Sequence, residues 1–314
     1  MQAVAGWKAG PQINRKPGGS PLARREAREG YLFISPWLAG FVVFYAGPMV
    51  ASFVLGVTSW NLLNPARWVG LDNFRQLIHD PLFWRALQVT AVYAVVAVPL
   101  DLLAALLLAA LLNQKVRGIG AYRTIFYLPT ILPGVVTAVV WRWVFNPEIG
   151  IINNILALLR LPGPLWLASP SWALPAMIIM SLWTIGTATV IFLGGLQGVP
   201  VELHEAADID GAGPWSRFWR ITVPLVSPSI FFNLITGMIG AFQVFTLPYI
   251  MTQGGPQNAT LFYVLYLYEN AFTYMKMGYA SAMAWILFLI IVILTLVQFR
   301  ISRRWVYYAG GDRV

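Results

Sequence analysis

Cysteine is absent from the 314-residue chain, and histidine and acidic residues are scarce. The lack of cysteine excludes disulfides, thiolate metal sites and thiol nucleophiles. With only two histidines, His79 and His204, and twelve carboxylates, the chain offers few candidates for a metal cluster or an acid–base pair. The sequence therefore predicts no metal site, no cofactor and no catalytic residues.

Charge is also low for a chain of this length. Charged residues make up 11% and hydrophobic residues 58%, against about 25% and about 45–50% in a typical globular domain. The polar surface is too small to coat a water-soluble particle, so the apolar excess must face lipid. A formal net charge of +9 is then typical of cytoplasmic loops and anionic lipid rather than of a nucleic-acid partner.

Long apolar stretches predict an all-α integral membrane protein with six transmembrane helices. A bilayer core needs about 20 mainly apolar residues per helix, and six stretches satisfy this: residues 31–59, 86–112, 122–145, 173–197, 229–251 and 278–300. The transmembrane domain then covers residues 31–300. A Gly- and Pro-rich basic tail, residues 1–30, is predicted to be disordered, and residues 301–314 form a C-terminal tail.

Basic residues predict the orientation. With the N-terminus inside, the inner segments hold most of the 21 lysines and arginines, as the positive-inside rule requires. Both termini are therefore predicted to be cytoplasmic.

The inner loop at residues 198–228 is acidic, unlike the other inner segments. Pro200 suits the first position of a helix. Glu202 and Glu205 would then lie in its first turns, where acidic side chains interact favourably with the helix dipole. Gly211 and the Gly and Pro that follow it end this helix. The pattern predicts a short, rigid helix suited to a groove on another protein. The alternative is that the loop merely links two spans.

The same loop resembles the EAA loop of membrane subunits of binding-protein-dependent ABC importers. The family signature is EAA-x3-G-x9-I-x-L-P, and the matching residues are Glu205, Ala206, Ala207, Gly211, Ile221 and Pro224, with Val223 in place of the usual Leu. A second segment, TQGGPQNAT at residues 252–260, resembles the T-x-GGP-x-NAT segment of carbohydrate-uptake permeases. Weaker matches are VGLDNF at 69–74 and WRWVFNPEIGIINNIL at 141–156.

This resemblance implies a type I ABC importer permease fold in a prokaryotic inner membrane. Such a permease pairs with a second, related permease, two ATP-binding subunits and an extracytoplasmic solute-binding protein. The chain has no G-x4-G-K-[ST] phosphate loop, so ATP hydrolysis is assigned to the partners. The residues predicted to couple to the ATPase are Glu202, Glu205, Ala206, Ala207, Asp210 and Gly211. The residues predicted to contact the binding protein are Gly254, Gly255, Pro256 and Asn258.

Polar and aromatic residues on the fourth and fifth spans are candidates for a solute path. A sugar site needs a flat apolar ring together with amide or hydroxyl groups. The candidates are Trp183, Thr184, Thr187, Asn233, Thr236, Gly237, Gly240 and Gln243. The alternative is helix packing, a common role of Thr and Gly in membranes.

Asp101 lies within the second span, where a carboxylate is costly. It is either a structural partner for a donor on a neighbouring helix or an acid in the solute path. The predicted function is import of a mono- to oligosaccharide. The alternatives are import of a glycerol phosphate or another polar solute, or, with Asp101 as its main support, a gradient-driven secondary carrier.

Overall fold

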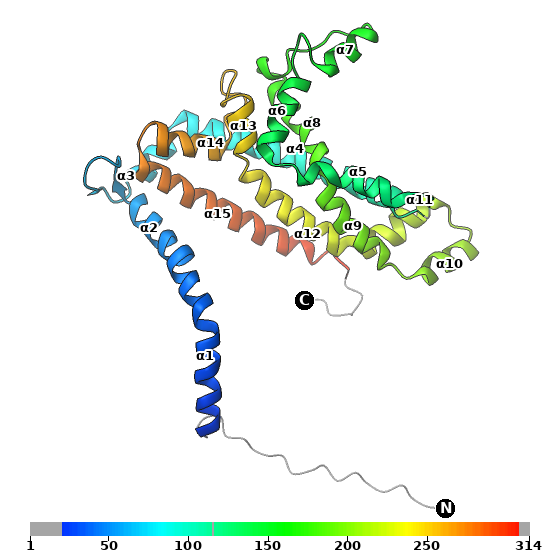
Figure 1. Cartoon of the computed structure of the whole chain (residues 1–314), viewed down its shortest axis with the longest axis horizontal. Helices are drawn as coiled ribbons and strands as arrows, with labels where there is room; N and C mark the ends of the chain where they lie inside the picture. Colours follow the sequence, from blue (N-terminus) through cyan, green and yellow to red (C-terminus); the bar gives the residue numbers. More distant parts are fainter. Residues whose placement is uncertain (1–20, 115, 308–314) are drawn as a thin grey trace, which may run out of the picture. The chain divides into compact units, whose positions relative to one another are not determined.

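The computed structural model describes residues 21–114 and 116–307, and helices dominate them (Figure 1). The chain divides into two units between Ser52 and Phe53.

The first unit contains a long exposed helical segment. It comprises α1 (Pro21–Phe41), the π-helical turn η1 (Val42–Ala46) and the start of α2 (Gly47–Gly56). No residue of α1 is buried. Together, Pro21–Gly56 has the length and hydropathy of a membrane span. A segment of this length and apolarity is suited to face lipid.

The start of α1 corrects the predicted tail. Residues 21–30 were expected to be disordered, but they are helical; residues 1–20 and 308–314 lie outside the described residues. Strong helix formers fill this stretch, and Arg25 Nε donates to Glu29 Oε1 at 2.9 Å with i, i+4 spacing. Local helix propensity therefore decided the structure here, despite the high polarity of the segment.

The second unit begins with a two-stranded antiparallel pair and continues as a helical bundle. Its elements are β1 (Thr58–Ser59), β2 (Arg67–Trp68), α3 (Asp72–His79), α4 (Pro81–Leu112), α5 (Ile119–Ile131), α6 (Gly134–Val144), α7 (Ile151–Leu158), η2 (Trp166–Ala168), α8 (Ala173–Ser181), η3 (Leu182–Thr184), α9 (Gly186–Gln197), α10 (Val201–Ile209), α11 (Pro214–Arg217), η4 (Phe218–Thr222), α12 (Val223–Phe242), α13 (Thr246–Met251), α14 (Tyr263–Tyr268), η5 (Glu269–Thr273) and α15 (Met277–Ser302).

Four segments of the described chain are each long and apolar enough to span a membrane, and two bent helix pairs bring the number to six if each pair is one span. The pair α5–α6 bends by 99° and the pair α8/η3–α9 by 47°. At the first bend, Leu132 and Pro133 have extended backbones, because a residue that precedes proline is displaced from the helical region. The six predicted spans thus contain two breaks that the hydropathy pattern did not reveal.

The inner loop is shorter than predicted. Residues 214–228, assigned to the loop 198–228, belong to the helical segment Pro214–Met251. Pro224 and Pro228 lie within α12 without ending it, as neighbouring helices permit in membranes.

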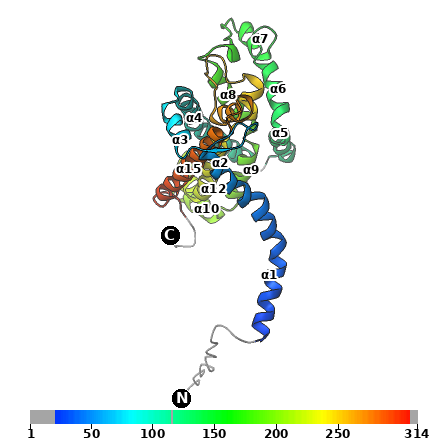
Figure 2. The same cartoon turned by 90° about the vertical axis from the view of Figure 1, so that its left-hand side faces the viewer.

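Helix α4 is central to the packing of the second unit. It packs against α9, α12, α14 and α8. Near its C-terminal end, Ala105 and Ala109 are fully buried among apolar side chains of α9 and α12, including Phe192 and Val226. Small residues let helix backbones approach closely where lipid supplies no hydrophobic drive. The packing leaves α7 and α10 at opposite ends of this unit (Figure 2).

The VGLDNF segment has a structural role. Asn73 is buried, and its Nδ2 donates to the carbonyl oxygens of Gly56 and Thr58 at 2.9 and 2.8 Å. Gly70 takes a positive φ of 59° at the turn before α3. This segment therefore fixes the strand pair against α3.

Candidate functional site

Helix α10 occupies the predicted coupling position. Pro200 is its N-cap residue, and Glu202 lies in its first turn. At its C-terminal end, Gly211 takes a left-handed φ of 73°. Ala212 N–H donates to the Ala207 carbonyl at 2.9 Å, and Gly211 N–H donates to the Asp208 carbonyl at 3.1 Å. These two bonds define a Schellman motif, so the glycine ends the helix as the sequence predicted.

The exposed surface of α10 differs in part from the predicted coupling surface. Ala206 is exposed, but Ala207 is 7% exposed and packs within its own chain. Leu203 and Ile209 are 43% and 87% exposed, although the sequence pattern did not single them out. The exposed apolar residues of α10 are therefore Val201, Leu203, Ala206 and Ile209. The acidic candidates Glu202, Glu205 and Asp210 are exposed beside them, as is Gly211.

An ion pair fixes α10 to the helix that follows. Arg217 Nη1 on α11 donates to Asp208 Oδ1. In the same segment Phe218 packs against the apolar cluster around Phe192, whereas Trp215 and Trp219 are exposed. Phe218 therefore anchors one side of this segment to the bundle, and the two exposed tryptophans lie on the surface. Exposed tryptophans of this kind are typical of a membrane interface.

A cavity of about 240 Å³ lies at the two helix bends. Hydroxyl-bearing residues from six helical elements contribute to it, together with apolar residues. Thr184 and Thr187 were predicted path residues. The other lining residues are Tyr93, Pro129, Thr130, Leu132, Gly134, Thr137, Met180, Ser181 and Leu247. The sequence did not identify these nine lining residues, because only the bends bring them together. Pro133 is the sequence signal that indicates the first bend.

Asp101 lies next to this cavity and bonds to one of its lining residues. Ser181 Oγ is 2.8 Å from Asp101 Oδ1 and donates to it. The bond joins α4 to α8 within the membrane-spanning region. Of the two roles predicted for Asp101, the structure supplies the contact that the structural role requires: a donor on a neighbouring helix.

The predicted path residues on α12 and just after it fall into two groups. Asn233 is buried and its Nδ2 donates to the Ser229 carbonyl at 3.0 Å. A Cβ atom on Gly237 would lie 3.1 Å from Val98 Cγ1, so this glycine permits close packing of α12 on α4. The remaining three, Thr236, Gly240 and Gln243, are exposed.

Trp183, the remaining path candidate, is 48% exposed. It makes an edge contact with Trp141, with ring centroids 5.9 Å apart, and it does not line the cavity.

The TQGGPQNAT segment forms a compact loop. The Thr260 hydroxyl donates to the Gly255 carbonyl at 2.6 Å and lies 2.7 Å from the Thr252 hydroxyl. Arg85 Nε on α4 donates to the Asn258 carbonyl at 3.2 Å. The loop is therefore held by hydrogen bonds within itself and by one from Arg85 on α4.

The candidates for binding-protein contact in this loop differ in exposure. Gly254 is buried, Gly255 and Pro256 are half-buried, and Asn258 is exposed. Gln253 and Gln257, which the sequence pattern did not single out, are also exposed. The surface offered to a partner is therefore mainly Gln253, Gln257 and Asn258.

Asp80 joins three helices at the N-terminal end of α4. Its Oδ1 caps the helix by accepting from Leu82 N–H at 2.9 Å, and its Oδ2 accepts from the hydroxyls of Tyr266 and Tyr279 at 2.6 Å each. Burial raises the pKa of Asp80, but these hydrogen bonds outweigh burial and hold the pKa below its ordinary value. The carboxylate therefore ties α4 to α14 and α15.

We expect this carboxylate to make stability acid-sensitive. Because its pKa is lower in the folded state, its contribution is present above the ordinary carboxyl pKa of about 4 and is lost as pH falls through the folded-state value. Asp80→Asn keeps a capping side chain but removes the charge, so it should cost about 1–2 kcal/mol at pH 7. The loss on acidification should shrink correspondingly.

Thermal unfolding in detergent between pH 7 and pH 3 measures this effect. The exposed Asp72→Asn at the start of α3 is the matched control. Equal pH profiles for wild type and Asp80→Asn would contradict the assignment.

The fold and these sites define a membrane-spanning permease subunit. Residues 101–307 match the family described as the binding-protein-dependent transport system inner membrane component, and the chain belongs to this family. The chain is 43% identical over 294 residues to the probable ABC transporter permease protein YesP of Bacillus subtilis, covering 92% of this chain and 95% of that one. The predicted family is confirmed.

Other relatives carry sugar names. The lactose transport system permease protein LacF of Rhizobium radiobacter is 35% identical, over 90% of this chain and 97% of that protein. The trehalose/maltose transport system permease protein MalF of Thermococcus litoralis is 34% identical, over 90% and 97%.

A solved structure confirms the fold class. A chain of a bacterial alginate ABC transporter, in complex with an alginate pentasaccharide-bound periplasmic protein, superposes with a TM-score of 0.79 at 23% identity. The match covers 90% of this chain and 96% of that chain. At this identity the likeness establishes the type I importer permease fold and nothing about the solute.

Proposed function

We propose that the chain forms, with a second related permease, the translocation path for a mono- to oligosaccharide delivered by an extracytoplasmic binding protein. ATP-binding subunits on the cytoplasmic side drive the cycle. The observation that carries this proposal is α10, a helix that ends in a Schellman turn and exposes Leu203, Ala206 and Ile209. The sugar names of the relatives supply the solute class.

Coupling through α10 requires a stiff element. The Schellman turn and the Arg217–Asp208 ion pair hold both ends of the Asp208–Gly211 segment. A push on the exposed apolar face is therefore transmitted to α11 and α12 rather than absorbed by a flexible loop. Alternating access follows if nucleotide binding to the partner biases two arrangements of the bundle.

The cavity at the helix bends supports the solute part of the proposal. Its threonine, serine and tyrosine hydroxyls suit the hydroxyl groups of a sugar, and Met180, Leu132 and Leu247 supply apolar contact for C–H faces. The exposed residues Thr236, Gly240 and Gln243, on α12 and just after it, lie outside this cavity. In our proposal the second permease completes the path along that face.

Membership in a binding-protein-dependent family removes the case for a gradient-driven carrier. In the proposed orientation both termini are cytoplasmic, and α10 faces the ATP-binding subunits. A glycerol phosphate remains the alternative solute, and competition of sugar uptake by glycerol 3-phosphate separates the two.

Thr187→Leu and Gln243→Leu test the path. Loss of a neutral hydrogen bond to the solute should raise the solute concentration for half-maximal uptake about three- to tenfold. Uptake of radiolabelled sugar into vesicles that carry the complete transporter, loaded with ATP, measures it. The exposed Thr124→Leu on α5, outside the cavity, is the matched control. Normal apparent affinity in both variants would refute the assigned path.

A further inference from the structure

The charged N-terminal part of α1 lies at a defined depth relative to the membrane. Pro21–Gly56 spans 36 residues, which corresponds to about 54 Å of helix, whereas the hydrocarbon core is about 30 Å thick. The segment PLARREAREG at residues 21–30 precedes the continuous apolar sequence that starts at Tyr31. Residues 21–30 therefore extend beyond the hydrocarbon, at the level of the lipid headgroups.

The charges of this segment are sorted by helix face. Arg24 and Arg28 lie one turn apart on the same face at i, i+4 spacing, and Tyr31 and Ser35 continue that face toward the apolar part. Glu26 and Glu29 fall on other faces of the helix. Arg25 bonds to Glu29 at 2.9 Å, whereas no ion pair of Arg24 or Arg28 occurs within the described residues.

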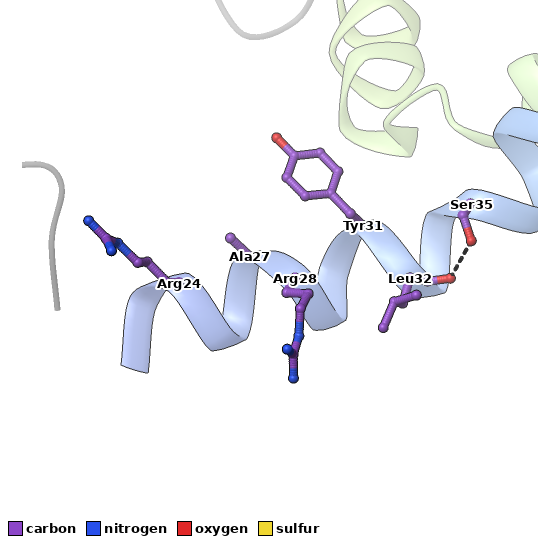
Figure 3. Close-up of a pocket in the computed structure, with 6 residues that line it drawn as sticks. All are labelled: Arg24, Ala27, Arg28, Tyr31, Leu32 and Ser35. Carbon is purple, nitrogen blue, oxygen red and sulfur yellow. Dashed lines mark hydrogen bonds between the residues drawn. The ribbon is translucent and has the colours of Figure 1, made fainter. Parts of the chain in front are cut away.

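A shallow surface follows this face of α1. Its side chains are Arg24, Ala27, Arg28, Tyr31, Leu32 and Ser35 (Figure 3). We call these six residues the basic face. Tyr31 and Leu32 are 72% and 63% exposed, and Ser35 Oγ is turned to the Leu32 carbonyl at 2.8 Å. Along the helix the face runs from the two arginines, Arg24 and Arg28, through Tyr31 to Leu32 and Ser35.

We propose that the basic face binds the phosphate headgroup of an anionic phospholipid. Arg24 and Arg28 hold the phosphate, the Tyr31 hydroxyl lies at the interface, and the acyl chain runs along α1 past Leu32. The order of basic, aromatic and apolar side chains follows the order of headgroup, interface and hydrocarbon in a bilayer leaflet. Guanidinium groups suit phosphate through paired N–H donors.

The acidic residues explain why Arg25 does not share this role. Arg25 already donates to Glu29, so a carboxylate lies beside it on its face of the helix. An anionic headgroup on that side would meet like charge. The proposal therefore assigns different roles to neighbouring arginines on one helix turn. A general attraction of positive charge to the membrane would predict the same role for all three arginines.

The chain offers a direct assay because it contains no cysteine. The full chain, with Ala27→Cys labelled by an environment-sensitive fluorophore, is placed in phosphatidylcholine nanodiscs that contain brominated phosphatidylglycerol in increasing amounts. Quenching of the label reports phosphatidylglycerol at the basic face. The variants Arg24→Gln and Arg28→Gln are compared with Arg25→Gln, which removes the same charge one residue away.

We expect the apparent affinity for phosphatidylglycerol to fall about fivefold in Arg24→Gln and in Arg28→Gln, and less than twofold in Arg25→Gln. High salt should weaken the lipid preference. Millimolar inorganic phosphate should not restore fluorescence, since the ligand is a membrane lipid and not a free anion.

Equal losses in all three variants, or no preference for phosphatidylglycerol in the unsubstituted chain, would overturn the proposal. Quenching that disappears when partner subunits are added would also overturn it, because a protein would then cover the basic face. None of these outcomes bears on transport, so the lipid site and the proposed function are tested separately.

Discussion

Gly211→Val should reduce ATP-dependent uptake at least tenfold while the protein remains folded in the membrane. Gly211 has a φ of 73°, which costs an ordinary residue about 1–2 kcal/mol and is a steric outlier for a β-branched one. The substitution therefore breaks the Schellman turn that holds Ala212 N–H on the Ala207 carbonyl. The exposed face of α10 then loses its fixed direction relative to α11.

A neighbouring glycine is the control for this experiment. Gly213 has a φ of −66° in an extended conformation, and nothing lies within 4 Å of the position of its Cβ. Gly213→Val should therefore transport normally. Sugar uptake and ATP hydrolysis are measured together in vesicles that contain the complete transporter.

Loss of uptake with continued ATP hydrolysis in Gly211→Val is the signature of broken coupling. Glu205→Lys addresses the same surface without changing the backbone, and it should also impair uptake. Normal uptake in both variants would remove α10 from the mechanism, whatever the number of spans.

Gly278→Ala should have the largest effect on stability, about 3 kcal/mol or more. A Cβ atom at Gly278 would lie 1.9 Å from the Thr58 carbonyl oxygen and 3.2 Å from the Leu55 carbonyl oxygen. Both obstacles are backbone atoms, so no side-chain rotation can relieve the overlap. The start of α15 must move away from β1 to accept even one methyl group.

The yield of monodisperse protein in detergent and its thermal midpoint measure this effect. Gly194→Ala in α9 is the control, because nothing lies within 4 Å of its Cβ position and alanine favours a helix. The control should be neutral or stabilising. An unchanged midpoint in Gly278→Ala would show that α15 and the strand pair do not pack as described.

Local patterns in the sequence determine where helix α10 begins and ends. Pro200, the acidic first turns and Gly211 are signals that act over a few residues. They predict the C-terminal end of α10 and place its N-terminal end within one residue, since Pro200 is the N-cap and not the first helical residue. The same signals do not show that Ala207 faces its own chain. The partner of a small residue depends on which helix passes beside it, and local spacing does not specify that.

At residues 21–30 the amino-acid composition led to a wrong prediction. The composition indicated disorder, but the helix formers and the Arg25–Glu29 pair extend α1 back to Pro21. Composition averages over a segment, whereas helix formation depends on the order of residues within it.

The amino-acid sequence is enough to identify the family and the six apolar stretches, because hydropathy and the EAA pattern are properties of consecutive residues. The position of the cavity depends instead on tertiary contacts. The bends at Leu132–Pro133 and before Gly186 bring Thr130, Ser181 and Thr187 together. Such a site is assembled by distant segments, whose separation along the chain leaves no pattern of spacing to read.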